Sequence, residues 1–288
     1  MINEIKIISL GEAALNIFDI LDQRKNLYAN GALCPTGISA IDEVTGGINP
    51  TEVMVVAGRP SMGKTSLMLQ FAYSVASHGK RVLFLSCEMV VSSLVDRLIS
   101  SVAEIEASKI KFGKLSAAEI NEIALNIETE QFATKPLYLS YVPTLTLSLI
   151  TQAIEKINPD VIFIDHIQLL CLEQKDNLAN EISNAMYFLK RLAGEKNIGL
   201  VVGSQTTRAG ENQLKEKSFT QSFLKGSGGI EEAADQVLEL ELAKGEKQES
   251  SDWQMILRIK KNKFGALTGA PLIFKRRFLK FMEINRNE

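Results

Sequence analysis

Short apolar runs alternate with longer amphipathic segments along most of the chain. Four runs carry almost no polar residue, which is typical of strands buried on both faces of a sheet; they are Val53–Ala57, Val82–Ser86, Val161–Asp165 and Gly199–Gly203. Two more strands are predicted at Leu137–Tyr141 and Gln236–Leu242. Helices are predicted at 65–77, 90–102, 117–132, 147–156 and 179–196. This alternation predicts an α/β fold whose central sheet is mostly parallel.

The last part of the chain has a different pattern. Three strands separated by short turns are predicted at Trp253–Lys261, Pro271–Lys275 and Phe278–Ile284. Strands joined this closely pair antiparallel, because a parallel pair needs a long crossover. We therefore expect an antiparallel extension of the sheet at its C-terminal end.

The N-terminal segment predicts one amphipathic helix followed by a linker. Residues 9–24 place apolar side chains on one helical face, and Ser9 and Glu12 have the spacing of a capping box. Asp22–Pro35 is polar and predicts a linker. The helix could pack on its own domain or on a neighbouring copy of the chain, and the pattern alone leaves both open.

The composition is that of an ordinary globular protein. The 288 residues include 45% hydrophobic and 23% charged residues, which excludes a disordered, collagen-like or fibrous chain. Three scattered cysteines and two histidines argue against a disulfide scaffold, a zinc site or a His-rich metal site. No apolar run reaches the ~18 residues of a membrane span, and the start lacks a signal-peptide pattern. We expect a cytoplasmic protein with no membrane partner.

The charge balance at first argues against nucleic acid as a partner. The chain has 32 basic and 34 acidic residues, which gives a formal net charge of −2. The basic residues are unevenly placed, however, because the stretch from Arg258 to Lys280 contains several lysines and arginines and no acidic residue. Local placement therefore says more about a nucleic-acid partner than the whole-chain charge does.

One motif carries specific chemistry. Residues 58–65, GRPSMGKT, fit G-x-x-x-x-G-K-[ST] between a predicted strand and a predicted helix. Glycines let such a loop turn its N–H groups toward phosphates, and the helix N-terminus adds positive dipole. The predicted nucleotide-binding residues are Gly58, Arg59, Pro60, Ser61, Met62, Gly63, Lys64, Thr65 and Ser66. Lys64 would reach the β- and γ-phosphates and Thr65 would bind Mg²⁺, whereas the alternative is a glycine-rich turn before a helix.

Three polar residues follow predicted strands, at the edge where α/β sheets hold their ligands. Asp165 would hold the magnesium, usually through a water, and otherwise caps the next segment. Glu88 could accept a proton from the water that attacks the γ-phosphate, or it could be a carboxylate stabilised at a helix start. Gln205 could contact the γ-phosphate or the attacking water.

Five segments in order, GRPSMGKT, LSCEM, IDHIQLL, GSQTTR and GSGGIEEAAD, resemble the ATPase domain of DnaB-type replicative helicases. The resemblance runs from about Thr36 to the C-terminus and is closer than that to recombinases or circadian-clock ATPases. It implies a RecA-like P-loop ATPase fold, ATP and Mg²⁺ as cofactors, and a homo-hexameric ring around single-stranded DNA. It also adds primase or a helicase loader as a candidate partner, although no residue indicates either.

The resemblance implies roles for individual residues. Lys64 matches the family's phosphate-binding lysine and Thr65 its magnesium ligand. Glu88 matches the catalytic glutamate. Asp165 matches the aspartate linked to magnesium, and Gln205 matches the glutamine that senses the γ-phosphate. A channel loop that touches the DNA backbone is matched by Lys225, Gly226, Ser227, Gly228 and Gly229, although such glycines also suit a mobile turn. The residues that reach a neighbouring subunit's ATP site are matched by Lys261 and Lys263.

The chain also departs from the family. Lys263 stands where the family has an arginine finger, so we expect weaker activation of the neighbour's site, because lysine lacks the planar fork of arginine. His166 stands where tyrosine is usual, and we expect it to pack beside the site without a catalytic role. Arg208 matches a family arginine and is a candidate DNA or nucleotide contact.

Together these expectations divide the chain into a linker helix and segment at 1–34 and one ATPase domain at 35–288. The N-terminal helix resembles the family's linker helix, which docks on the adjacent subunit, while the family's helical N-terminal domain has no counterpart here. Trimming and a natural short form would both explain this. We expect an ATP-driven ring that moves 5′ to 3′ on single-stranded DNA and unwinds duplex during replication. The alternatives are a RecA-like recombinase or regulatory ATPase, and a DNA-binding ring with little ATP turnover.

Overall fold

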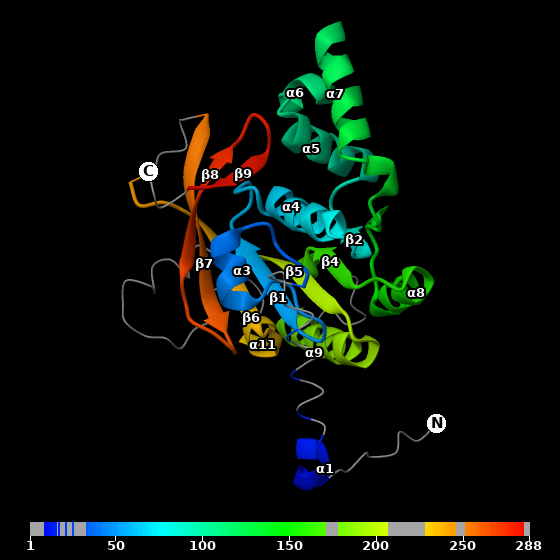
Figure 1. The fold of residues 1–288 in the computed structure, drawn as a ribbon, viewed down its shortest axis with the longest axis vertical. Coiled ribbons are helices and arrows are strands. Elements are labelled where there is room, and N and C mark those ends of the chain that lie inside the picture. The colour runs from blue at the N-terminus through cyan, green and yellow to red at the C-terminus, as the bar shows by residue number, and fades with distance from the viewer. Residues whose placement is uncertain are drawn as a thin grey trace.

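One sheet organises the molecule (Figure 1). The structure, a computed structural model, describes residues 9–15, 17, 21, 25, 33–170, 178–206, 228–245 and 251–284. In these ranges the strand order is β3-β2-β4-β5-β1-β6-β7-β8-β9. The strands are β1 Val53–Gly58, β2 Val82–Ser86, β3 Leu137–Tyr141, β4 Val161–Asp165, β5 Gly199–Gln205, β6 Gln236–Leu242, β7 Asp252–Asn262, β8 Gly269–Lys275 and β9 Lys280–Glu283.

The sheet is parallel from β3 to β6 and antiparallel from β6 to β9. The four runs with almost no polar residue, now part of β1, β2, β4 and β5, are buried apart from the last residue of β5. Burial on both faces is the reason that these runs are continuously apolar. The predicted α/β class, the mostly parallel sheet and its antiparallel extension are confirmed.

Helices cover both faces of the parallel part. Their bounds are α1 Leu10–Leu15, α3 Ser39–Thr45, α4 Lys64–Ser77, α5 Val91–Ala103, α6 Ala107–Lys111, α7 Ala117–Thr129, α8 Leu147–Ile157, α9 Leu178–Lys196 and α11 Gly228–Ala233, with short 3-10 turns η1 Phe132–Thr134 and η2 Ile167–Leu169. Three of them, α3, α6 and α11, are not predicted, because helices of 5 to 7 residues show too little periodicity.

Two of the boundaries that differ from the prediction have a local reason. The helix predicted at 117–132 ends at Thr129, and Gln131 with a left-handed φ of 52° separates it from η1. The strand predicted from Phe278 begins instead at Lys280, because Leu279 has φ of 54° in the turn after β8. A non-glycine residue in this conformation interrupts regular structure.

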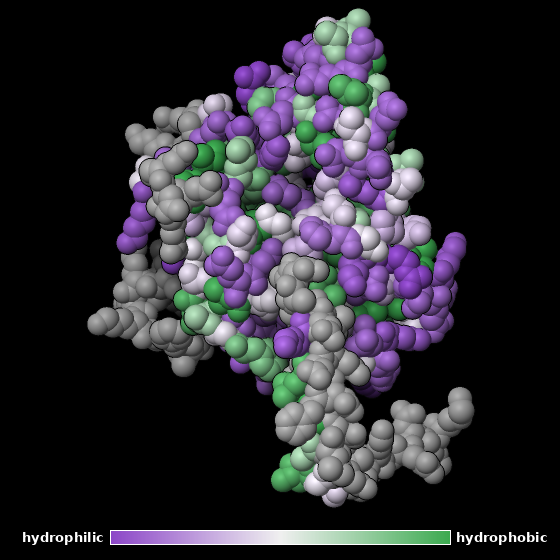
Figure 2. All heavy atoms as spheres, viewed as in Figure 1, coloured by the Kyte–Doolittle hydropathy of each residue, from purple (hydrophilic) through white to green (hydrophobic). Residues whose placement is uncertain are grey.

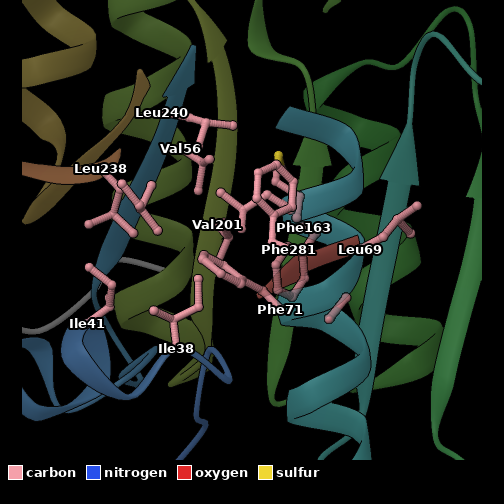
Figure 3. Packing of buried hydrophobic residues seen from close by; sticks show 14 of the residues in the cluster. Ile38, Ile41, Val56, Leu69, Phe71, Phe163, Val201, Leu238, Leu240 and Phe281 are labelled. Carbon is pink, nitrogen blue, oxygen red and sulfur yellow. The ribbon is translucent and has the colours of Figure 1, made fainter. Parts of the chain in front are cut away.

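Two apolar cores lie on opposite faces of the sheet. Val53, Val55 and Ala57 of β1 face the core under α8, α9 and α11, whereas Met54 and Val56 face the core under α3 and α4. This alternation follows from the two-residue period of a strand. Figure 3 shows the second core, in which side chains of α3, α4, β1 and β5 fill the space between α4 and the sheet. Together the two cores hold the carboxyl ends of the strands and the start of α4 in fixed positions.

Helix α7 projects from the domain (Figure 1). Its N-terminus has a capping box formed by Ser116 and Glu119, with hydrogen bonds in both directions. None of its residues is buried, and Ile120 and Ile127 are 54% and 36% exposed. Figure 2 shows hydrophobic residues among hydrophilic ones over this projection. The apolar face of α7 therefore lies open in the single chain.

The N-terminal helix also stands apart from the domain in Figure 1. Leu10, Ile17 and Leu21, which lie on its predicted apolar face, are 86%, 39% and 49% exposed. One of the two alternatives for this helix was packing on its own domain, but Leu10, Ile17 and Leu21 are not packed on it in the single chain. Most of the predicted linker lies outside the described residues. None of the helices in the described ranges is long and apolar enough to cross a membrane.

Candidate functional site

The G-x-x-x-x-G-K-T loop joins the carboxyl end of β1 to the first residue of α4. Gly63 precedes the helix with φ of 91°, a conformation that glycine adopts without strain. A Cβ on this residue would lie 2.9 Å from ring carbons of Phe274 and Phe281, which are stacked with centroids 4.2 Å apart. Backbone conformation and packing therefore both require glycine here, and they place Lys64 and Thr65 in the first turn of α4.

The structure brings together the residues predicted to handle phosphate and magnesium. Thr65 Oγ1 donates a hydrogen bond to Asp165 Oδ2 at 2.6 Å, and Lys64 Nζ lies 3.7 Å from Asp165 Oδ1. Asp165 ends β4 and is fully buried. Burial lowers the pKa of Lys64, while the negative charges of Asp165 and Glu88 act in the opposite direction. This buried lysine is therefore partly balanced by carboxylates before any phosphate binds.

Asp165 keeps one oxygen available. Among the described residues no donor makes a hydrogen bond to its Oδ1, although the atom is buried. A Cβ on Gly203 of β5 would lie 2.9 Å from this oxygen, so glycine keeps the space beside it open. Mg²⁺ prefers oxygen ligands and keeps several of its waters. The hydroxyl of Thr65 and the carboxylate of Asp165 therefore fit a magnesium ion held partly through water.

Glu88 and Gln205 lie on either side of His166. Gln205 Nε2 lies 3.1 Å from His166 Nε2, and Glu88 Oε2 lies 3.6 Å from His166 Nδ1. The imidazole is almost completely buried, whereas the Glu88 side chain is 60% exposed. His166 thus makes polar contacts between the predicted base and the predicted γ-phosphate sensor, in addition to the packing expected from sequence.

These groups surround a pocket of about 400 Å³. Its lining residues are Arg59, Pro60, Ser61, Gly63, Lys64, Thr65, Glu88, Met89, Arg97, Gln205, Phe274, Arg276 and Leu279. Three residues of the predicted nucleotide-binding set do not line the pocket. Gly58 is the last residue of β1, Met62 is buried in the core, and Ser66 Oγ accepts a hydrogen bond from Arg97 Nη1 at 2.9 Å. The pocket therefore opens above the loop at the carboxyl end of β1.

Arg97 is a pocket residue that the sequence analysis missed. It lies on α5 between Leu94 and Leu98, which are both buried. Burial lowers its pKa, and the charges of Asp165 and Glu88 counteract this. An arginine on the apolar face of a helix was the signal that could have revealed it, since a charge is seldom buried without a function or a partner.

Lys261 and Lys263 lie at the opposite end of β1 from the pocket. Lys263 Nζ contacts Asp235 Oδ1 at 2.8 Å, and the other oxygen of Asp235 accepts from the N–H of Val53, the first residue of β1. Lys261 Nζ donates to the carbonyl of Glu231 at 2.6 Å. The 6 residues of β1 separate its two ends by roughly 16 Å at the usual rise of a strand. Neither lysine can reach the phosphate loop of its own chain.

The predicted DNA-contact residues are only partly described. Gly228 and Gly229 form the first two residues of α11, and a Cβ on Gly229 would collide with Ser183 of α9. Glycine is therefore needed at 229 for α11 to pack on α9, a reason independent of DNA. Lys225, Gly226, Ser227 and Arg208 lie outside the described residues, so their contacts stay predictions.

A family model described as the DnaB-like helicase C terminal domain matches residues 34–283. The chain belongs to this family. The predicted resemblance is thereby confirmed, and membership in the family implies that the chain binds a nucleotide.

Curated relatives are named as replicative helicases. A probable plasmid replicative DNA helicase of Chlamydia trachomatis serovar L2 is 32% identical over 257 residues, which cover 88% of this chain and 55% of the relative. The replicative DNA helicase DnaC of Bacillus subtilis is 26% identical over 286 residues, which cover 96% of this chain and 62% of the relative. The chain thus spans about half the length of the first of these relatives.

Solved structures share the fold. A DnaB-like replicative helicase, reported with its interactions with primase, has a TM-score of 0.80 at 23% identity, covering 98% of this chain and 68% of that one. A separately solved ATPase domain has a TM-score of 0.82 at 23% identity, covering 97% and 100%. A KaiC-like protein of Pyrococcus horikoshii OT3 scores 0.59 at 16% identity over 87% and 98%. The fold similarity to this KaiC-like protein is weaker than that to the other two structures.

Proposed function

We propose that the chain is the motor of a ring-shaped DNA helicase, which hydrolyses ATP to move along single-stranded DNA and unwinds duplex during replication. One structural observation carries the proposal beyond family membership. The pocket lies at one end of β1 and the two matched lysines lie at the other, which supports a site that a second copy completes.

Five residues of the site, together with the N–H groups of the loop, have proposed tasks in hydrolysis. The loop N–H groups and Lys64 bind the β- and γ-phosphates. Thr65 and Asp165 would hold Mg²⁺, which supplies positive charge to the phosphates when it is bound. Glu88 extends into the pocket and accepts the proton of the attacking water. Gln205 also lines the pocket, and the loss of the γ-phosphate would change the hydrogen bonding of the Gln205 side chain.

The proposed assembly is a homo-hexameric ring. The phosphate pocket of one copy would meet the lysine of the next copy, and such a contact is head-to-tail. Head-to-tail contacts generate a closed ring when the rotation from one copy to the next allows closure. The exposed apolar faces of the N-terminal helix and of α7 support the same arrangement, since a helix of one copy can cover an apolar face of the next. Particle images with ATP test it, because closed rings and open filaments are directly distinguishable.

DNA would run through the ring against the segment around Lys225–Gly229. Contacts from glycine-rich backbone and lysine to phosphates carry no sequence information, and they weaken as salt rises. Hydrolysis between two copies would reorient one of them and move its loop along the strand. We place this activity in the cytoplasm, with primase or a helicase loader as a candidate partner.

Unwinding of a forked duplex by the full chain tests the proposal. We expect ATP-dependent strand separation on a fork with a 5′ single-stranded tail, and none with the Lys64→Ala variant. DNA-stimulated turnover by a stable hexamer without strand separation would contradict the helicase assignment and favour a translocase.

One alternative has a specific observation in its favour. Lys263 Nζ is bound to Asp235 of its own chain, and a lysine held in this way would leave a DNA-binding ring with little ATP turnover. The rate of ATP hydrolysis with and without single-stranded DNA separates the two functions. Stimulation by DNA supports the motor, and negligible turnover under both conditions supports the alternative.

A further inference from the structure

Asp235 at the amino end of β1 is shared by two lysines. Lys190 Nζ, from α9, lies 2.6 Å from both carboxylate oxygens, and Lys263 Nζ lies 2.8 Å from Oδ1. The backbone N–H of Val53 donates to Oδ2 at 2.9 Å. The Asp235 side chain is 6% exposed, whereas Lys190 and Lys263 are 31% and 40% exposed. A buried carboxylate thus holds two cations that both reach the surface.

The carboxylate is ionised in this setting. Burial by itself would raise the pKa of Asp235, but the hydrogen bonds from Lys190, Lys263 and Val53 outweigh it and hold the pKa below its usual value. One negative charge therefore faces two positive charges, and the carboxylate of Glu52 also acts on both lysines. Lys263, the more exposed of the two lysines, is the cation that a phosphate arriving from outside the chain meets.

The two lysines are not equivalent partners. A buried carboxylate that loses its only cation is strongly destabilised, because its charge stays in a poorly hydrated place. If Lys263 were alone on Asp235, its departure would create this situation. Lys190 touches both oxygens, so the carboxylate stays paired when Lys263 leaves. Lys263 is therefore the partner that can be given up.

No second lysine is described that could replace Lys261 at its hydrogen-bond partners. Its Nζ donates to the carbonyls of Glu231 at 2.6 Å and Glu232 at 3.3 Å, in the last turn of α11. Carbonyls at a helix end need a donor, and a cation there is favourable. Moving Lys261 away would leave these carbonyls without this donor, so Lys261 is suited to holding α11 against β7 in place.

We propose that Lys190 is a positioning residue that keeps Asp235 neutralised and so frees Lys263 to contact the γ-phosphate bound by a neighbouring copy. The inference rests on the proposed function and deepens it, because it assigns the mobile trans contact to Lys263 and an anchoring role to Lys261. It also explains how a lysine paired within its own chain can still act on its neighbour.

Steady-state ATP hydrolysis by the full chain with single-stranded DNA tests this role. In the Lys190→Met variant Asp235 holds Lys263 alone, so kcat should fall at least about tenfold while KM for ATP stays within about twofold. Lys190→Arg keeps a cation on Asp235 and should keep most of the activity. Lys196→Met is the matched control, since Lys196 lies on the same helix, is paired with Glu155 and has no contact with the cluster among the interactions described.

A double variant distinguishes positioning from a merely structural role. Asp235→Asn retains an oxygen that can accept from the N–H of Val53 but has no charge to hold Lys263. Combined with Lys190→Met, it should restore kcat to within about threefold of the wild type. Thermal unfolding of each variant monitors folding.

Two results would overturn the inference: wild-type kcat in Lys190→Met, or a loss that the double variant leaves unrepaired. A wild type without any ATP turnover would instead overturn the proposed function and this inference with it. An active wild type together with an unaffected Lys190→Met overturns the inference alone.

Discussion

A buried aspartate lies near each end of β1, and the two aspartates have different surroundings. At the carboxyl end Asp165 bonds to Thr65 and keeps Oδ1 free of hydrogen bonds from the described residues. At the amino end both oxygens of Asp235 are bonded, by Lys190, Lys263 and the N–H of Val53. An acid with a spare oxygen is prepared for a water or a metal, whereas a saturated acid holds cations in place.

The separation of the two ends matters as much as their chemistry. The strand between them is too long for the lysines to act on the pocket of the same chain. In the proposed assembly one chain therefore contributes one half to each of two different sites. Each of the following predictions alters the residues near one end of β1, or a residue of β6 where it pairs with β1. The residues near the other end of β1 stay unchanged.

The largest effect is expected at the phosphate loop. Lys64→Ala removes the cation that we propose reaches the β- and γ-phosphates, so ATP turnover should fall by about 10³-fold or more. Radiometric or coupled assays of phosphate release measure this loss. Lys111→Ala, at an exposed position on α6, is the control and should keep wild-type turnover. Substantial turnover in Lys64→Ala would show that the pocket is not the hydrolytic site.

Glu88→Ala should lower turnover by about 10²-fold or more while ATP binding stays nearly unchanged, because a base acts on the attacking water and contributes little to affinity. Fluorescent-nucleotide titration measures binding, and phosphate release measures turnover. Hydrolysis at the wild-type rate would contradict the assignment of the base to Glu88. Weakened binding with an unchanged rate would make it a binding residue.

At the other end of β1 the expected effect is smaller. Lys263→Ala should reduce DNA-stimulated turnover at least about tenfold, without loss of ATP binding, since the pocket of the same chain is untouched. Lys263→Arg should exceed the wild type, because arginine presents a planar fork of donors to the γ-phosphate. Equal rates for lysine, arginine and alanine at this position would remove Lys263 from the reaction.

The smallest effect concerns Glu239, which lies on β6 in register with Ala57 of β1. Burial raises the pKa of Glu239 to about 7, and Glu241 acts in the same direction while Lys260 opposes it. A carboxyl with a raised pKa stabilises the fold in its protonated form. This contribution is fully present below the ordinary value of about 4.5 and is lost as the pH rises through about 7.

Glu239→Gln should therefore flatten the dependence of stability on pH. Relative to the wild type it should gain about 1–2 kcal/mol in free energy of unfolding between pH 4.5 and pH 8. Urea unfolding at the two pH values measures the difference, and Glu128→Gln on exposed α7 is the control. An equal shift at both pH values would mean that the ionisation of Glu239 does not affect stability.

The sequence predicted the elements whose local pattern reflects their final environment. Val161–Asp165 is continuously apolar because it is buried on both faces, and the loop motif lies between strand and helix as its chemistry requires. Periodicity shows that α7 has an apolar face, but it cannot show what covers that face, and in the single chain Ile120 is left exposed.

The parts of the site that were not predicted depend on contacts between distant segments. The pairing of Asp235 with Lys190 joins α9 to the segment before β6, and no spacing along the chain indicates it. His166 was expected only to pack, because its contacts with Glu88 and Gln205 come from two other strand ends. Local patterns describe single elements, whereas these polar contacts arise only when the sheet order is known.

Mixing two defective variants tests most directly whether the site is completed between copies. Lys64→Ala chains retain their trans lysines, and Lys263→Ala chains retain their phosphate loops. In a random equal mixture roughly a quarter of the interfaces pair an intact loop with an intact lysine. We predict that DNA-stimulated ATP turnover of the mixture rises well above the mean of the two separate variants. Turnover no higher than that mean would show that loop and lysine act within one chain, contrary to this account.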